Sequence, residues 1–178
     1  MKNTHQSFYK EFQILPVDIR DYDELKILDC HCFGIDGFGE ERIKYFIENA
    51  HLFSKIIEKR IGTLLGATIY YHPFFGERNE FYTDPYCKKI MEEEIKSICL
   101  CWMAIKPQFQ RQGLGTQILK HDIALIREAR YDSICLNSHT KQTTKFYESI
   151  GFEILLNIEK YYVSGLPSDF MIYKMNQN

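Results

Sequence analysis

The sequence predicts one α/β domain built on a mixed, mainly antiparallel sheet of six or seven strands, with helices on both faces. Hydrophobic patterns with strand and helix periods follow one another in the order βααβββαβαββ. The 178 residues suit one compact domain, and no repeat or linker divides positions 1–178. Hydrophobic residues make up 45% of the chain, which is enough for a sizeable core.

The amino-terminal half is expected to contain a strand, two helices and a pair of strands. Leucines at positions 25 and 28 have helical spacing, and the glycine-rich stretch 34–39 separates the two helices. The apolar run 63–71 is typical of a central strand. The expected ranges are Phe12–Val17, Asp21–Phe33, Glu40–Asn49, Leu52–Glu58 and Gly62–Tyr71. The following segment, His72–Ile95, contains several turn signals and is expected to be irregular.

The carboxyl-terminal half begins with a continuous apolar run, Ile98–Ile105, which predicts a buried strand. Apolar residues at helical spacing predict an amphipathic helix over Gly113–Arg130. Gly151 follows a further helical segment at the position where glycine often ends a helix. The remaining expected elements are Ser133–Asn137, Thr140–Ile150, Glu153–Tyr161 and Phe170–Met175.

Charge and composition exclude several classes of protein. There are 22 Lys and Arg against 24 Asp and Glu, a net charge of -2, which argues against an electrostatic nucleic-acid binder. The first residues lack the apolar segment of a signal peptide, and no stretch approaches 18 apolar residues, so no membrane span is expected. The six cysteines are therefore expected to be reduced thiols in a cytoplasmic protein.

The stretch Ile105–Thr116 carries the most informative chemistry. A buried strand runs into a loop with two glycines, and that loop opens directly into a long helix. The first turn of a helix has unpaired backbone N–H groups, and the helix dipole adds positive character, so such a turn binds anions. Arg111 adds a full positive charge, and the loop contains no carboxylate. We therefore expect a phosphate-binding loop here.

Three interpretations of the loop compete on the residues alone. A dinucleotide-binding loop needs a third glycine, but position 118 is isoleucine. A P-loop needs Gly-Lys followed by Ser or Thr, which is absent. An ordinary strand–helix turn remains the simplest alternative to a phosphate site.

The pattern Q-x-x-G-x-G at Gln110–Gly115 resembles motif A of the GCN5-related N-acetyltransferase (GNAT) superfamily. About thirty residues later, the pattern F-Y-x-x-x-G-F at Phe146–Phe152 is similar to the end of motif B of the same family. The resemblance implies a GNAT-like fold with a splayed central strand pair. It also implies an N-acetyltransferase that moves the acetyl group of acetyl-CoA directly to a primary amine, without a metal. A small-molecule acceptor is favoured.

The resemblance further implies roles for individual residues. Pantetheine would pair with the backbone of the strand before motif A, and the loop amides would hold the pyrophosphate. The residues concerned are Met103, Ala104, Ile105, Gln110, Arg111, Gln112, Gly113, Leu114, Gly115 and Thr116. Tyr147 matches the position whose hydroxyl lies near the thioester sulfur. A phenol has an ordinary pKa of about 10, so it is protonated at neutral pH and can donate that proton to a leaving thiolate.

The general base is not identified. Members of the family often carry a glutamate on one of two strands, where this chain has Cys99 and Cys135. The remaining candidates are Glu93, Glu94, His72 and His139, or a water molecule.

Other interpretations stay open. The chain could be a CoA-binding sensor without turnover, an acetyltransferase of protein amino termini or lysines, or a nucleotide-binding protein. The acidic loop 34–39 is expected either to border the amine site or to be a simple turn. The aromatic segment 72–95 could be a substrate lid, a contact in a possible homodimer, or a cover for the core. The cysteine pairs lack zinc-site spacing, so no metal is expected.

Overall fold

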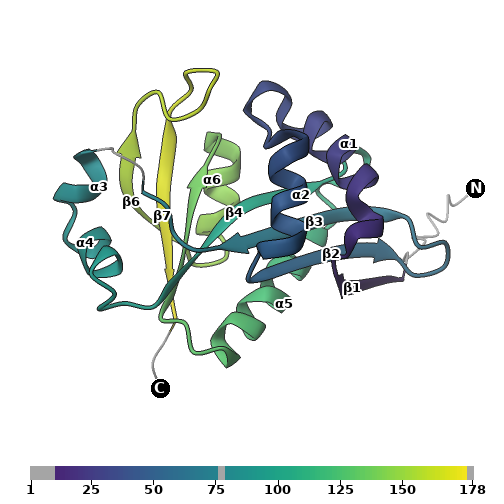
Figure 1. Cartoon of the computed structure of the whole chain (residues 1–178), viewed down its shortest axis with the longest axis horizontal. Helices are drawn as coiled ribbons and strands as arrows, with labels where there is room; N and C mark the ends of the chain where they lie inside the picture. Colours follow the sequence, from purple (N-terminus) through teal and green to yellow (C-terminus); the bar gives the residue numbers. More distant parts are fainter. Residues whose placement is uncertain (1–10, 76–78, 176–178) are drawn as a thin grey trace, which may run out of the picture.

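The computed structural model describes residues 11–75 and 79–175 and contains a seven-stranded sheet (Figure 1). The strands lie in the order β1-β2-β3-β4-β5-β7-β6. Their bounds are β1 Phe12–Pro16, β2 Leu52–Glu58, β3 Leu64–Tyr71, β4 Ser97–Ile105, β5 Ser133–Ser138, β6 Glu153–Ile158 and β7 Ser168–Lys174. The predicted mixed sheet is confirmed, and the only parallel neighbours among the described strands are β4 and β5.

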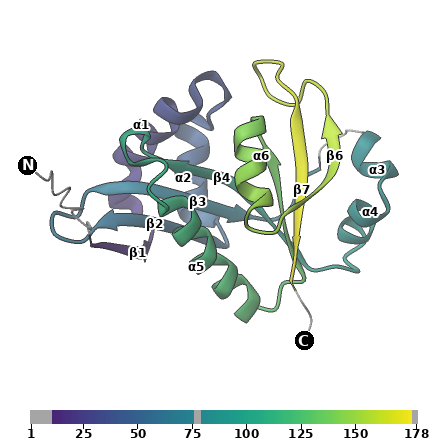
Figure 2. The same cartoon turned by 180° about the vertical axis from the view of Figure 1, so that it is seen from behind.

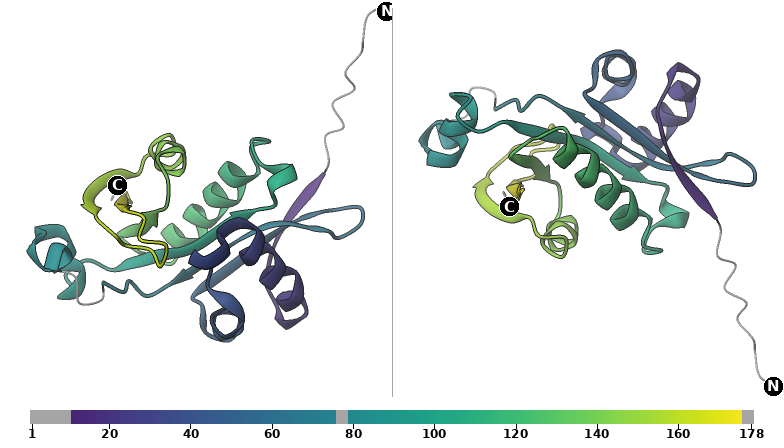
Figure 3. Two further views of the ribbon diagram at one scale, coloured as in Figure 1. Left: turned by 90° about the horizontal axis from the view of Figure 1, so that it is seen from above. Right: turned by 90° about the horizontal axis from the view of Figure 1, so that it is seen from below.

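Helices cover both faces of the sheet, as predicted (Figure 3). On one face lie α1 (Tyr22–Phe33) and α2 (Gly39–Asn49), and on the other lie α5 (Leu114–Glu128) and α6 (Lys141–Glu148). Figure 2 shows α5 and α6 in front of the strands. Short 3-10 helices span η1 Ile19–Asp21, η2 Gly34–Asp36 and η3 Pro107–Phe109. No helix in the described parts of the chain is both long and apolar enough to cross a bilayer.

The β4–β5 pair separates halfway along its length. Pairing runs from Ser97 opposite Ser133 to Leu100 opposite Leu136, and then stops. The second half of β4 still pairs with β3 as far as Ile105 opposite Gly66. The predicted splay is therefore confirmed, and it leaves the β5 side of Cys101–Ile105 without a partner strand.

A β-bulge in β4 coincides with the start of this splay. In the register with β3, Leu100 lies opposite Tyr70 and Trp102 lies opposite Ile69, so Cys101 is one extra residue. Leu100 packs in the core beneath α5 and α6, whereas Trp102 packs beneath α1 and α2. Cys101 lines a cavity on the α2 side, so two consecutive side chains lie on the same face. Beyond the bulge, Met103 returns to the face that carries α5 and α6.

The expectation of an irregular segment over His72–Ile95 was wrong. Two short helices, α3 (Asn79–Thr83) and α4 (Pro85–Met91), lie beside β6 and β7 (Figure 1). Asp84 caps α4 by accepting from the backbone N–H groups of Tyr86 and Cys87 at 2.9 and 2.8 Å. Pro85 occupies the first helical position, which suits its fixed φ and missing N–H. The pair Asp84-Pro85 therefore begins a helix, although it has the composition of a turn.

A buried carboxylate anchors α5 to the sheet. Asp122 is fully buried and accepts from Ser54 Oγ on β2 at 2.7 Å and from Thr68 Oγ1 on β3 at 2.6 Å. Burial raises the pKa of Asp122 above its ordinary value, and these hydrogen bonds oppose that change. The two bonds fix the position of α5 along the strands that precede the splay.

Candidate functional site

The loop between β4 and α5 has the backbone shape of an anion site. Arg111 and Gly113 both adopt positive φ, at 59° and 80°. Gly113 stands at the helix cap, and no side chain caps the first turn of α5. Two glutamines brace the loop from within, because Gln110 donates to the Ile105 carbonyl at 3.0 Å and Gln112 donates to the Gln108 carbonyl at 3.1 Å. The first-turn N–H groups of α5 can therefore face a ligand.

Gly115 brings this loop against the splayed strand. A Cβ atom at Gly115 would lie 3.1 Å from Met103 Cε and 3.4 Å from Phe146 Cζ. Only glycine therefore allows the first turn of α5 to approach β4 and α6 this closely without a shift of those side chains. The two predicted motifs thus meet in space at Gly115 and Phe146.

Tyr147 lies beside the splayed strand on the face of α5 and α6. Its hydroxyl donates to Met103 Sδ at 3.7 Å, and its ring packs edge-on against Phe146 and Phe152. The residue is only 9% exposed. Burial raises the pKa of the Tyr147 phenol well above its ordinary value, so the group keeps its proton at neutral pH. Of the strand residues expected to contact pantetheine, Met103 shares this face, whereas the Ala104 side chain packs beneath α1 and α2.

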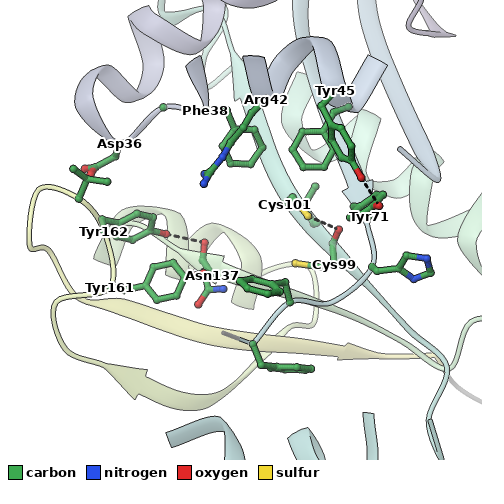
Figure 4. Close-up of a pocket in the computed structure, with 17 residues that line it drawn as sticks. Asp36, Phe38, Arg42, Tyr45, Tyr71, Cys99, Cys101, Asn137, Tyr161 and Tyr162 are labelled. Carbon is green, nitrogen blue, oxygen red and sulfur yellow. Dashed lines mark hydrogen bonds between the residues drawn. The ribbon is translucent and has the colours of Figure 1, made fainter. Parts of the chain in front are cut away.

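A cavity of about 610 Å³ lies on the opposite face of the sheet, where β4 leaves β5 (Figure 4). Its floor includes Cys99, Leu100 and Cys101 of β4. Its walls come from residues 36–46, which we call the α1–α2 segment, from the end of β3 and the residues that follow it, from β5 and from the β6–β7 loop. They comprise Asp36, Gly37, Phe38, Arg42, Tyr45, Phe46, Tyr71, His72, Phe74, Phe75, Asn137, Tyr161, Tyr162 and Val163. The cavity is therefore largely aromatic.

Asp36 joins two of these walls. Its Oδ1 accepts from the backbone N–H of Ser164 in the β6–β7 loop at 2.8 Å, and its Oδ2 lies 3.1 Å from Nε2 of His139, which follows β5. The hydrogen bond from Ser164 is the main cause that holds the pKa of Asp36 below its ordinary value. Tyr162 packs edge-on against His139 and donates to the Asn137 carbonyl at 3.0 Å. We refer to these contacts of Asp36, His139, Tyr162 and Ser164 as the Asp36 bridge.

A second buried carboxylate shapes the α1–α2 segment. Asp29 accepts from the backbone N–H groups of Phe38 and Gly39 at 3.0 and 2.9 Å and from Trp102 Nε1 at 2.7 Å. A Cβ atom at Gly37 would lie 2.6 Å from Asp29 Oδ2, so glycine is required for this close approach. Asp29 therefore fixes the segment that supplies Asp36, Phe38 and Arg42 to the cavity.

The four candidate bases lie in different places. His72 lines the cavity, and His139 contacts Asp36 at its edge. Glu93 and Glu94 follow α4, are exposed, and do not line the cavity. The geometry therefore favours the two histidines over the two glutamates.

The cysteines form no metal centre within the described residues, and no group of three His, Cys, Asp or Glu side chains there could hold a metal ion. All six cysteines are free. Cys101 donates to the Cys99 carbonyl at 3.4 Å (Figure 4). Hydrogen bonding to Cys101 and Cys135, together with burial, raises the pKa of Cys99 well above its ordinary value, so the thiol stays protonated at neutral pH and cannot accept a proton.

Sequence reasoning missed several residues that shape the cavity. Arg42 and Tyr45 face it from α2, yet in the sequence they look like the solvated side of an amphipathic helix. Asp36 and Ser164 meet across a separation of 128 positions. Tyr161 and Tyr162 lie in the loop after β6, which ends at Ile158, so the predicted strand Glu153–Tyr161 was too long at its end.

Comparison with protein families gives one match. Residues 48–154, more than half of the chain, match the acetyltransferase (GNAT) domain. A comparison with curated protein sequences finds no match.

Solved structures share the fold at low identity. The chain is similar to the NatC complex bound to Gag peptide and CoA, with a TM-score of 0.73, 14% identity, and coverage of 93% of this chain and 99% of that one. It is also similar to Ard1 from Thermoplasma volcanium, with a TM-score of 0.74, 15% identity, and coverage of 93% and 99%. A third similar structure is the ribosomal-protein-S18-alanine N-acetyltransferase from Escherichia coli, with a TM-score of 0.72, 17% identity, and coverage of 94% and 96%.

Proposed function

Because the chain belongs to the GNAT superfamily of acetyltransferases, we propose that it transfers the acetyl group of acetyl-CoA directly to a primary amine. One observation carries this proposal. The gap that opens in the sheet after Leu100 has the β4–α5 loop and Tyr147 on one face, and the aromatic cavity on the other. A donor and an acceptor that enter from opposite faces can therefore meet at the gap, as direct transfer requires.

Acetyl-CoA is a substrate that this site would hold by its phosphates and its pantetheine arm. The amides of Arg111–Thr116 and the Arg111 side chain suit the pyrophosphate because they supply N–H donors and positive charge. The backbone of Met103, Ala104 and Ile105 is available for the pantetheine amides on the side that β5 has left. The similar fold of the NatC complex, which is bound to CoA, supports this assignment.

The amine nitrogen attacks the thioester carbonyl, forming a C–N bond, and the C–S bond then breaks. The leaving CoA thiolate needs a proton, and Tyr147 carries one next to Met103. The amine loses its proton to a base, for which His72 and His139 are the side chains at the cavity. The products are an N-acetylated amine and CoA.

A peptide amino terminus is the second candidate acceptor. It is favoured by the comparison, since the solved structures include one bound to a peptide and one named for a ribosomal protein. A cytoplasmic location and a possible homodimer remain predictions from the sequence.

A panel of acceptors with acetyl-CoA tests the proposal. Small amines, amino acids and short peptides are compared by release of free CoA thiol, and each product is identified by mass spectrometry. Release of CoA that depends on an amine is the expected result. Tight binding of CoA with no amine-dependent release from any acceptor would instead indicate the CoA-binding sensor.

A further inference from the structure

The cavity contains two charged side chains of opposite sign, and they differ in how they are engaged. Both carboxylate oxygens of Asp36 have partners, in the backbone N–H of Ser164 and the ring of His139. The Asp36 side chain is only 4% exposed. One of the two expectations for loop 34–39 was that it borders the amine site, where a carboxylate suits a cation, but the Asp36 carboxylate holds the cavity wall together. Asp36 is therefore poorly placed to bind an ammonium group of the acceptor.

Arg42, in contrast to Asp36, has a charged group that is exposed to the cavity. It lies in the first turns of α2, is exposed, and points into the cavity toward Asn137 and Tyr162 (Figure 4). Its guanidinium carbon lies 5.9 Å from the centre of the Phe38 ring, which orients the group by cation–π contact. Over residues 11–75 and 79–175, no carboxylate lies within ion-pair distance of Arg42. The guanidinium is thus oriented and available to an anion.

The remaining walls define the body and size of the acceptor. Tyr45, Phe46 and Tyr71 form one aromatic cluster, in which the Tyr45 and Tyr71 hydroxyls lie 2.7 Å apart. Phe75, Tyr161 and Tyr162 face it from the other side. The Asp36 bridge closes the route between the α1–α2 segment and the β6–β7 loop. An extended chain leaving by that route would have to break these contacts.

From this arrangement, we propose that the acceptor is a small amino acid-like molecule, a primary amine that carries a carboxylate and an aromatic or large apolar side chain. Arg42 binds the carboxylate as a bidentate pair, the aromatic walls hold the side chain, and the amine lies near Leu100 and Cys101 where the sheet opens. This inference rests on the proposed function, since it names the acceptor of the same reaction.

The test compares acceptors that differ only in the carboxylate. Phenylalanine, phenylalanine amide and phenethylamine are assayed with acetyl-CoA by release of free thiol. A charge-assisted bidentate pair in a partly enclosed site makes phenylalanine the better acceptor in kcat/KM by about tenfold to a hundredfold. Replacing Arg42 by Gln should raise the KM for phenylalanine by a similar factor while its effect on phenethylamine stays within twofold.

Two further variants separate this role from a general loss of structure. Arg42→Lys keeps the charge but not the bidentate geometry, and we expect it to restore part of the preference. Lys44→Gln, an exposed cation on the same helix that does not line the cavity, serves as the matched control and should change nothing. An equal loss for all three acceptors in Arg42→Gln would overturn the inference.

The inference and the proposed function fail in different ways. If phenethylamine or a peptide is acetylated with a kcat/KM equal to or higher than that of phenylalanine, the proposed acceptor class is wrong, but the protein is still an N-acetyltransferase. If CoA is released with none of the amines, amino acids or peptides, the proposed function is wrong, and the proposed acceptor class is then wrong as well.

Discussion

At the scale of single residues, the proposed chemistry depends on a phenol that is kept protonated by burial. Tyr147 is enclosed by Phe146 and Phe152, and its hydroxyl faces Met103 on the splayed strand. A donor to a leaving thiolate must still hold its proton when the C–S bond breaks. The raised pKa of Tyr147 satisfies that condition over the whole neutral range.

Tyr147→Phe keeps the ring and its packing but removes the transferable proton. We expect kcat to fall by about 10²–10⁴-fold, the usual contribution of a general acid, while the Kd for acetyl-CoA changes little. An acetyl thioester with a more acidic thiol should recover part of the lost rate, because its thiolate leaves without protonation. Steady-state kinetics with a confirmed acceptor make the measurement. A kcat within twofold of the parent would identify Tyr147 as a packing residue.

Gly113 offers a controlled test of the pyrophosphate site. Asp and Asn both tolerate its positive φ, and no atom lies within 4 Å of a Cβ added there, so the two replacements carry similar strain. Gly113→Asp adds a negative charge next to the phosphates. We expect a repulsion of about 1 kcal/mol or more, so Gly113→Asp should bind acetyl-CoA at least about fivefold more weakly than Gly113→Asn does. Calorimetry at two salt concentrations makes the comparison. Equal affinities for the two folded variants would place the pyrophosphate elsewhere.

At the scale of elements, the Asp36 bridge and the buried Asp122 each hold two parts of the fold together. The bridge ties the α1–α2 segment to the β6–β7 loop, and Asp122 ties α5 to β2 and β3. Both are carboxylates, yet their pKa values move in opposite directions, because hydrogen bonds dominate at Asp36 and burial dominates at Asp122.

The Asp36 bridge should control access to the cavity. Asp36→Ala removes both contacts and frees the β6–β7 loop. Amide hydrogen exchange over residues 161–167 should therefore become faster, and the KM for the acceptor should rise by about tenfold, with the Kd for acetyl-CoA unchanged. Asp23→Ala, at an exposed carboxylate on α1, is the control. Unchanged exchange in Asp36→Ala would show that other contacts hold the loop.

Asp122 gives a pH dependence with a defined sign. Its pKa is higher in the folded than in the unfolded state, so folding takes up a proton in this range. Its contribution to the free energy of unfolding is therefore fully present below the unfolded pKa and is lost as pH rises through the folded pKa. Relative to Asp122→Asn, the parent should lose stability from about pH 4 upward and then level off. Urea unfolding at several pH values measures the difference, and an opposite slope would contradict the burial effect.

Elements with a clear hydrophobic period were predictable, whereas features that depend on distant partners were not. The strand Ile98–Ile105 and the helix Gly113–Arg130 match β4 and α5 closely because apolar spacing dictates both. The helices α3 and α4 were not predicted, because Asp84-Pro85 has the composition of a turn as well as that of a helix start. The bulge at Cys101 and the Asp36 bridge arise from register and tertiary contacts, which no local pattern encodes.

At the scale of the whole molecule, the two proposed substrates occupy opposite faces of one sheet and meet where it opens. The donor side is formed by the loop after β4 and by α5 and α6, and the acceptor side by the α1–α2 segment and the β6–β7 loop. The carboxyl-terminal and amino-terminal parts of the chain thus both contribute to the acceptor side (Figure 1).

Binding of acetyl-CoA should stabilise the whole domain. A ligand that binds only the folded state at about 100 times its Kd adds about 2.7 kcal/mol to the free energy of unfolding. For a chain of this size, that raises the Tm by about 5–10 °C. Thermal unfolding with and without acetyl-CoA makes the measurement, and Gly113→Asp supplies the control, with a smaller shift at the same concentration. A parent protein with no shift would not bind acetyl-CoA at this site.

The bulge at Cys101 sets which face of the sheet each later side chain of β4 occupies. If Cys101 occupied a regular position in the strand, with no bulge, Met103 would turn toward the core beneath α1 and Ala104 would turn toward Tyr147. Deletion of Cys101 itself would remove the bulge and leave these faces unchanged, whereas a one-residue deletion beyond the bulge would interchange the two sides for every residue that follows it. The register of β4 beyond the bulge therefore decides which of its side chains face each proposed substrate.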